Sequence, residues 1–226
     1  MVALAPVGYT PDKEVIARRI AQMFHSGDVV NLGIGLPTLV ERYLLPDVEI
    51  LLQSEDGALV LGPPPGVKPG DRDLVDAGGG AATLRPGGCY FDSAASFAMI
   101  RGGHVDYTVL GVLEVDQAGN LANYKVPGKM VPGMGGAMDL CIGARVVVAA
   151  TVHFQPSGVS RMRRLCTLPL TAVGQVDWVV TDLGVFAVRE GRFHLTECFP
   201  PFTPEWIIQH TEADIVDETP LLKEAP

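Results

Sequence analysis

Short apolar runs that end at turn-forming residues recur along the chain and predict a buried β-sheet. The run 50–52 continues through Gln53 and Ser54 into a Glu-Asp-Gly turn at 55–57, and similar runs occupy 29–36 and 146–150. Near-continuous apolar runs of this length are typical of strands buried on both faces. The pattern therefore predicts an α/β fold with an open, mostly parallel sheet that carries helices on both faces.

The first predicted helix begins near residue 10, where an N-cap residue precedes apolar residues at helical spacing. Thr10 and Pro11 predict an N-cap and first helical residue, apolar residues between 16 and 24 share one face, and Gly27 ends the pattern. Further helices are predicted for 38–45, 94–101 and 204–210, and further strands for 106–115, 178–181, 185–188 and 193–195.

Two glycine-rich stretches interrupt these elements. Residues 62–73 contain three consecutive prolines between glycines and predict a surface loop. Residues 128–139 contain four glycines and three methionines, and two interpretations stay open for them. The stretch is either a loop packed by soft side chains or a loop whose uncovered N–H groups face an anion or oxyanion. Without a linker or repeat, residues 1–226 are interpreted as one domain with a loosely held tail from about 212.

Composition narrows the class of protein. The net charge of −9, with 47% hydrophobic and 19% charged residues, is typical of a globular protein and argues against nucleic acid or an anionic membrane as partner. The four cysteines form no Cys-x-x-Cys pair, and from the sequence pattern we expect neither a signal peptide nor a membrane-spanning run. We therefore expect reduced thiols, no metal and a cytoplasmic location, with His104 and His153 as structural residues.

Glu55 is the first candidate for chemistry because it follows a predicted central strand. Ligands of open α/β sheets bind beyond the carboxyl ends of the strands. The alternative is that Glu55 caps the next segment or points into solvent. The Gly33-x-Gly35 pair begins a dinucleotide fingerprint, but Thr38 stands where the third glycine belongs. We therefore expect no nicotinamide cofactor, and these glycines instead allow close approach of a ligand or strand.

Taken together, the motifs resemble the β subunit of the family I CoA-transferases of the 3-oxoacid (succinyl-CoA:3-ketoacid) type. The resemblance covers residues from about 12 to 190 in the family's order. Its matching stretches are 31–38, 53–57, 97–104, 121–123, 127–130, 133–140 and 166–171.

The resemblance implies a catalytic role for Glu55 as a nucleophile that passes through a mixed anhydride to a glutamyl-CoA thioester. It implies that Asn31 lies near the thioester oxygen, although an Asx turn is the alternative for this residue. Gly135 and Gly136 match a loop whose N–H groups stabilise an oxyanion, and Gly57 completes the Ser-Glu-x-Gly motif as a further substrate- or CoA-binding position.

The resemblance also implies the partners. Coenzyme A is a substrate, and no permanently bound cofactor is expected. An α subunit completes the enzyme as a heterodimer or heterotetramer, with the active site at the α–β interface. Acyl-CoA and a carboxylate are the expected small-molecule substrates.

Three departures from the family pattern keep other functions open. Asp56 replaces an asparagine, Gly79 a lysine and Val152 a glutamate. The alternatives are an acyl-CoA hydrolase or other acyl-processing enzyme on the same scaffold, or a non-catalytic partner subunit. The arginines between 161 and 164 either meet CoA phosphates or form a solvated basic loop.

Overall fold

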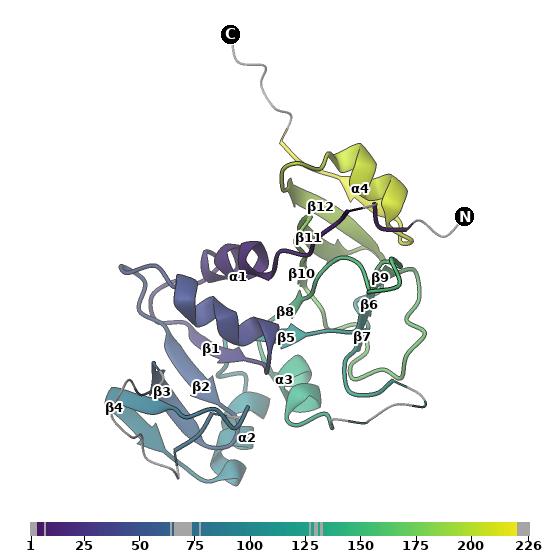
Figure 1. Ribbon diagram of the computed structural model, residues 1–226. Coiled ribbons are helices and arrows are strands. Elements are labelled where there is room, and N and C mark those ends of the chain that lie inside the picture. The colour runs from purple at the N-terminus through teal and green to yellow at the C-terminus, as the bar shows by residue number, and fades with distance from the viewer. Residues whose placement is uncertain are drawn as a thin grey trace.

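The fold is built on a ten-stranded sheet with the order β13-β12-β11-β10-β8-β5-β1-β2-β3-β4 (Figure 1). The computed structural model describes residues 4–6, 8–63, 65, 74–76, 78–126, 128, 131 and 133–220. The five central strands, β10 to β2 in this order, pair in parallel. Antiparallel pairings extend the sheet through β3 and β4 on one side and through β11 and β12 on the other, where the edge strand β13 pairs in parallel with β12. The predicted α/β fold with a mostly parallel central sheet is confirmed.

The elements of the main sheet follow the apolar runs. Its strands are β1 (Val29–Leu32), β2 (Leu51–Ser54), β3 (Ala58–Gly62), β4 (Thr83–Tyr90), β5 (Tyr107–Gly111), β8 (Val146–Ala150), β10 (Trp178–Val180), β11 (Gly184–Arg189), β12 (Arg192–Cys198) and β13 (Ile215–Asp217). A small sheet contains β6 (Glu114–Asp116), β7 (Leu121–Ala122) and β9 (Met162–Arg163). The helices are α1 (Lys13–Ala21), the 3₁₀ helix η1 (Leu36–Tyr43), α2 (Ser93–Arg101), α3 (Ala137–Gly143) and α4 (Pro204–His210).

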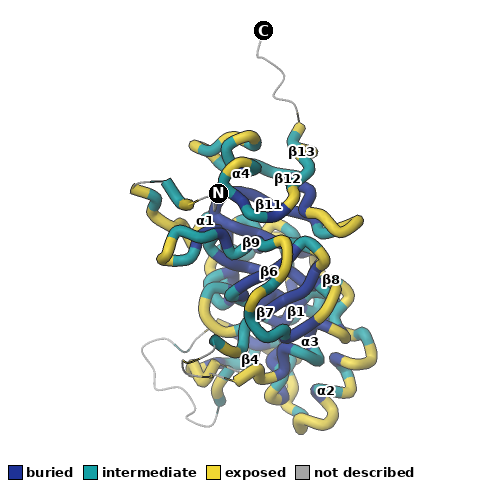
Figure 2. Tube along the Cα trace, turned by 90° about the vertical axis from the view of Figure 1, so that its right-hand side faces the viewer, coloured by how far each residue is buried: buried dark blue, intermediate teal, exposed yellow. Residues whose placement is uncertain are grey.

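Alternate residues of the central strands enter two separate hydrophobic clusters, one on each face of the sheet. Val109 of β5 and Val148 of β8 pack with residues of α1 and η1, whereas Leu110 and Val147 pack with residues of α2 and α3. The central strands are accordingly the most deeply buried part of the chain (Figure 2). Helices therefore cover both faces, as the apolar runs predict.

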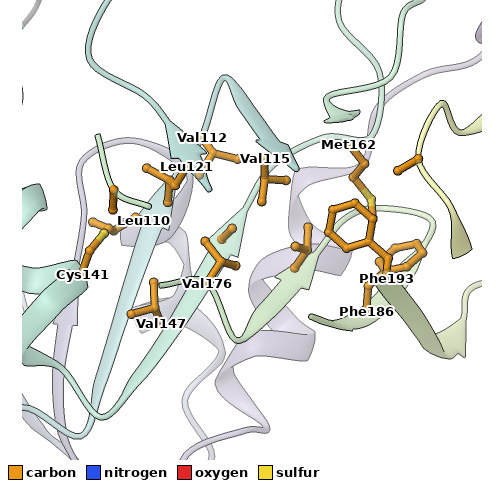
Figure 3. Close-up of a cluster of buried hydrophobic side chains, with 14 of the residues drawn as sticks. Leu110, Val112, Val115, Leu121, Cys141, Val147, Met162, Val176, Phe186 and Phe193 are labelled. Carbon is orange, nitrogen blue, oxygen red and sulfur yellow. The ribbon is translucent and has the colours of Figure 1, made fainter. Parts of the chain in front are cut away.

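The small sheet covers one side of the hydrophobic cluster that contains Leu110 and Val147. Val115, Leu121 and Met162 come from its three strands and lie in the same cluster as Phe186 and Phe193 of the main sheet (Figure 3). All five side chains are fully buried. Burial of such a side chain contributes about 1.5–3 kcal/mol, so the cluster firmly joins the two sheets.

Several boundaries differ from the prediction for identifiable reasons. The first helix begins after Asp12 and not at Thr10, because the Asp12 carboxylate accepts from the N–H groups of Glu14 and Val15. The helix predicted for 38–45 is a 3₁₀ helix that begins earlier. The strand predicted for 106–115 divides into β5 and β6, since the chain leaves the main sheet after Gly111 to join the small one.

The C-terminal segment and the two loops also differ in part. Residues 215–217 of the predicted loose tail form β13, which pairs with β12, while 221–226 lie outside the described residues. Most of the predicted loop 62–73 also lies outside them, and α3 begins inside the stretch predicted as a loop at 128–139. Within the described part of the chain, no helix has the length and apolarity to cross a membrane.

His153 is a structural histidine, as the sequence predicts. Its Nε2 lies 2.9 Å from Thr211 Oγ1, and that hydroxyl donates its own hydrogen to the Ile207 carbonyl at 2.7 Å. Thr211 must therefore accept, which places the proton of a neutral His153 on Nε2. Complete burial lowers the pKa of His153 to about 3.

Replacing His153 by Gln should make the free energy of unfolding less dependent on pH between about 3 and 6.5. Between pH 6.5 and about 3, unfolded His153 binds a proton that the folded state excludes, so stability falls as pH falls. His153→Gln should remove up to about 1.4 kcal/mol per pH unit from that slope, measured by urea denaturation across the range. His25→Gln is the control, since its side chain is 81% exposed. Equal slopes for His153→Gln and wild type would contradict the assignment.

Candidate active site

A cavity of about 390 Å³ lies at the carboxyl ends of β1, β2 and β5, next to the start of α3. This is the edge at which ligands of open α/β sheets bind. Its lining combines strand ends with a glycine-rich loop and consists of Asn31, Leu32, Gly33, Ile34, Glu55, Leu110, Gly111, Asn123, Gly133, Met134, Gly135, Gly136, Ala137 and Leu140.

Glu55 enters this cavity directly after β2 and touches the glycine-rich loop. A Cβ added to Gly136 would lie 2.9 Å from Glu55 Cγ and 3.2 Å from Phe97 Cζ, so only glycine fits there without displacement. A Cβ on Gly135 would lie 3.8 Å from Glu55 Oε1. The structure thus brings Glu55, Gly135 and Gly136 together, as expected for residues of one site.

Asn31 joins the same site through the neighbouring strand. In the parallel register of β1 and β2 it stands beside Gln53. Its Nδ2 lies 2.7 Å from Gln53 Oε1, 3.2 Å from the Gln53 carbonyl and 3.4 Å from Glu55 Oε2. These bonds run across the sheet to Gln53 and Glu55, and none of them is the contact of an Asx turn. Among the described residues, the buried Asn31 Oδ1 has no hydrogen-bond partner.

Gly57 has a different surrounding from the other predicted site residues. It is buried, has φ +129°, and an added Cβ would lie 2.1 Å from the Phe91 carbonyl. Its carbonyl accepts from Phe91 N–H at 3.0 Å, which ties the turn after Glu55 to the chain before α2. Gly57 does not belong to the cavity lining, and neither does the exposed Asp56.

Two polar residues at or beside the site, Gln53 and Asn123, were given no role by the sequence analysis. Gln53 is buried and donates through Nε2 to Ser96 Oγ of α2 at 3.0 Å. Asn123 lines the cavity, donates to the Gly111 carbonyl at 3.1 Å and accepts from the Thr171 hydroxyl at 2.7 Å. A polar residue inside an otherwise apolar run was the available signal for Gln53, because buried amides need partners.

Among the described residues that line the cavity, Glu55 is the only ionisable one. The arginines considered as phosphate ligands are engaged elsewhere: Arg161 donates to the Leu113 carbonyl, Arg163 to Glu212 and Arg164 to Asp214. Arg161 and Arg163 are partly buried by these contacts, whereas the side chain of Arg164 remains 64% exposed beside Asp214. No group of His, Cys, Asp and Glu that could hold a metal occurs in the part of the chain that the structure describes.

The rim of the cavity is apolar. Ile34 is 68% exposed and Met134 is 38% exposed, and both belong to its lining. Gly79, which stands where a lysine was expected, lies in an exposed turn with Asp76, and an added Cβ on the adjacent Gly78 would lie 3.6 Å from Ile34. The site thus combines one carboxylate, amide donors and an open apolar mouth.

Comparisons with known proteins find subunits of CoA-transferases among the relatives of this chain. The beta chain of the acetate CoA-transferase of Haemophilus influenzae is 55% identical over 206 residues, covering 90% of this chain and 91% of its own. A Bacillus subtilis protein, one of the subunits of a probable succinyl-CoA:3-ketoacid coenzyme A transferase, is 47% identical over 199 residues, covering 88% of this chain and 92% of its own.

The fold has solved counterparts as well. The crystal structure of an acyl-CoA transferase from Escherichia coli O157:H7 superimposes with a TM-score of 0.71 at 21% identity, over 92% of this chain. This chain spans only 43% of that longer protein. Residues 13–210 match the family described as Coenzyme A transferase. The chain therefore belongs to the coenzyme A transferase family.

Proposed function

We propose that the chain is the β subunit of a CoA-transferase that moves CoA between an acyl-CoA and a short carboxylic acid such as acetate or a 3-oxoacid. The observation that carries the proposal is the setting of Glu55. Its carboxylate is the one ionisable group in the described cavity lining, it follows a central parallel strand, and an amide and two glycines touch it. The names of the relatives supply the substrate class.

The first step uses the Glu55 carboxylate as the nucleophile on the thioester carbonyl. A C–O bond forms, the C–S bond breaks, CoA leaves as the thiolate, and Glu55 becomes part of a mixed anhydride. Gly135 and Gly136 lie against Glu55 without side chains, so their N–H groups are the donors that this proposal assigns to the oxyanion on the substrate carbonyl.

The second step returns the thiolate to the glutamyl carbonyl of the anhydride. The donor carboxylate leaves, and Glu55 carries CoA as a thioester until the acceptor carboxylate reverses both steps. During thiolate attack the negative charge develops on the Glu55 oxygen itself. Asn31 Nδ2, already 3.4 Å from Glu55 Oε2, is the donor for that oxyanion.

An α subunit completes the enzyme in this proposal. CoA carries phosphates, yet the described cavity lining holds no cation to meet them. The exposed Ile34 and Met134 provide an apolar rim that a second subunit would cover. The relatives are themselves named as single subunits of transferases, which supports a heteromeric enzyme. CoA acts as substrate, and the chemistry needs no bound cofactor.

Glu55→Gln should lower CoA transfer by at least about 10³-fold, because the amide cannot form the anhydride. The measurement is acceptor-dependent CoA exchange by the complete enzyme, with mass spectrometry of the peptide that contains Glu55 after borohydride reduction of the acyl-CoA-treated protein. Asp56→Asn is the matched control, since Asp56 is exposed and outside the cavity lining, and it should retain transfer.

Two outcomes would separate this function from the alternatives. Full transfer by Glu55→Gln, or no modification at Glu55 in the wild type, would argue for a non-catalytic partner subunit. Release of CoA to water that exceeds acceptor-dependent exchange would argue for a hydrolase on the same scaffold.

Gly136→Ala should slow transfer while leaving the fold intact. The new Cβ would lie 2.9 Å from Glu55 Cγ, so the carboxylate must shift from its position beside Asn31. Misplacement of about 1 Å costs on the order of 10²-fold in rate. Steady-state kinetics of the complete enzyme, with circular dichroism as a check of folding, would measure this, and an unchanged rate would show that Glu55 tolerates the displacement.

A further inference from the structure

We propose that Gln53 is a positioning residue that holds the Asn31 amide in the orientation from which it donates to Glu55. The proposal rests on the function proposed for Glu55. Gln53 does not line the cavity around Glu55 and is 4% exposed, so it acts through Asn31 and not on the substrate. Hydrogen bonds connect Ser96 of α2 to Gln53 of β2, Gln53 to Asn31 of β1, and Asn31 to the Glu55 carboxylate.

The orientation of the Asn31 amide follows from its contact with a backbone group. The Gln53 carbonyl can only accept, so the Asn31 atom 3.2 Å from it must be the Nδ2 donor. The Gln53 side-chain atom 2.7 Å from the same nitrogen must then be the acceptor Oε1. Gln53 Nε2 consequently faces Ser96 Oγ, and the direction of every bond in the chain is determined.

Ser96 anchors the far end of this chain. It is fully buried in the first turn of α2, and its hydroxyl accepts from Gln53 Nε2 at 3.0 Å. Buried amides are costly without partners, so this bond keeps Gln53 from rotating. Rotation of Gln53 would present its own NH₂ group to Asn31 Nδ2 and place two donors against each other.

The hydrogen bond to Glu55 depends on how the two hydrogens of the Asn31 side-chain NH₂ group are shared. This group has two hydrogens for three acceptors, and the distances place Gln53 Oε1 closest and Glu55 Oε2 furthest. Gln53 Oε1 thus binds one N–H of the amide, and the other N–H is shared between the Gln53 carbonyl at 3.2 Å and Glu55 Oε2 at 3.4 Å. Without Gln53 Oε1, the Asn31 side chain loses its shortest bond and the donor for the glutamyl oxyanion is no longer fixed.

The test is a double-mutant cycle on the complete enzyme with both subunits. Gln53→Met keeps the approximate volume and removes both amide atoms. We expect kcat for CoA transfer to fall about 10- to 100-fold, with KM for acyl-CoA within about twofold, since no substrate contact is lost. In an Asn31→Ala background the same change should cost less than about threefold, because Gln53 has then no amide to position.

Ser96→Ala and Ser160→Ala form the matched pair of controls. Both serines are buried and hydrogen-bonded, but Ser160 bonds to Met162 in a remote segment. Ser96→Ala should lower kcat about threefold or more, while Ser160→Ala leaves it unchanged. Should Gln53→Met fail to assemble, this pair decides the question.

Two results would overturn the proposal. One is an equal cost of Gln53→Met in the wild-type and Asn31→Ala backgrounds, which indicates a merely structural role. The other is an unchanged kcat for Gln53→Met or Ser96→Ala. The wild-type enzyme is first shown to form the Glu55–CoA adduct, so a failure of Gln53 variants to affect kcat is distinguishable from a failure of the nucleophile assignment.

Discussion

The parallel pairing of β1 with β2 is the constraint on which the site depends. Its register places Asn31 beside Gln53, and Glu55, the first residue after β2, lies 3.4 Å from the same Asn31 amide. A shift of one residue would turn Asn31 into the α1 and η1 side of the sheet and bring Leu32 in its place. Val30 and Leu52, which precede Asn31 and Gln53, oppose that shift because both are buried in the hydrophobic cluster on the α1 and η1 side of the sheet.

Helix α2 contacts both the strand β2 and the glycine-rich loop that together form the site. Ser96 accepts from Gln53 on the strand half, and the neighbouring Phe97 lies against Gly136 on the loop half. Asp92 caps the helix, and the preceding Phe91 N–H donates to the Gly57 carbonyl in the turn after Glu55. The position of the carboxylate is therefore tied to the start of a helix that contributes no residue to the described cavity lining.

The sequence predicts this architecture well where a signal is local. The run 146–150 and the helix 204–210 have the boundaries that their patterns indicate, and the strand ahead of Glu55 ends where its turn residues predict. Edge strands such as β4 were missed because arginine, glycine and proline interrupt them. Among site residues, Glu55 could be found from its motif, whereas the Gln53–Ser96 bond joins residues 43 positions apart and becomes visible only in three dimensions.

In the proposed mechanism, the electrostatics of the cavity give a reason for Glu55 to act together with a partner subunit. A carboxylate that attacks a thioester benefits from neutral donors, and a cation paired directly with it would weaken its nucleophilic oxygen. Here the neighbours of Glu55 are an amide and two glycines, and the described arginines of segment 161–164 have partners elsewhere. Charges that hold the phosphates of CoA are then best supplied at a distance from Glu55. A second subunit across the apolar rim of Ile34 and Met134 would satisfy both requirements, since it separates phosphate binding from the reacting carboxylate.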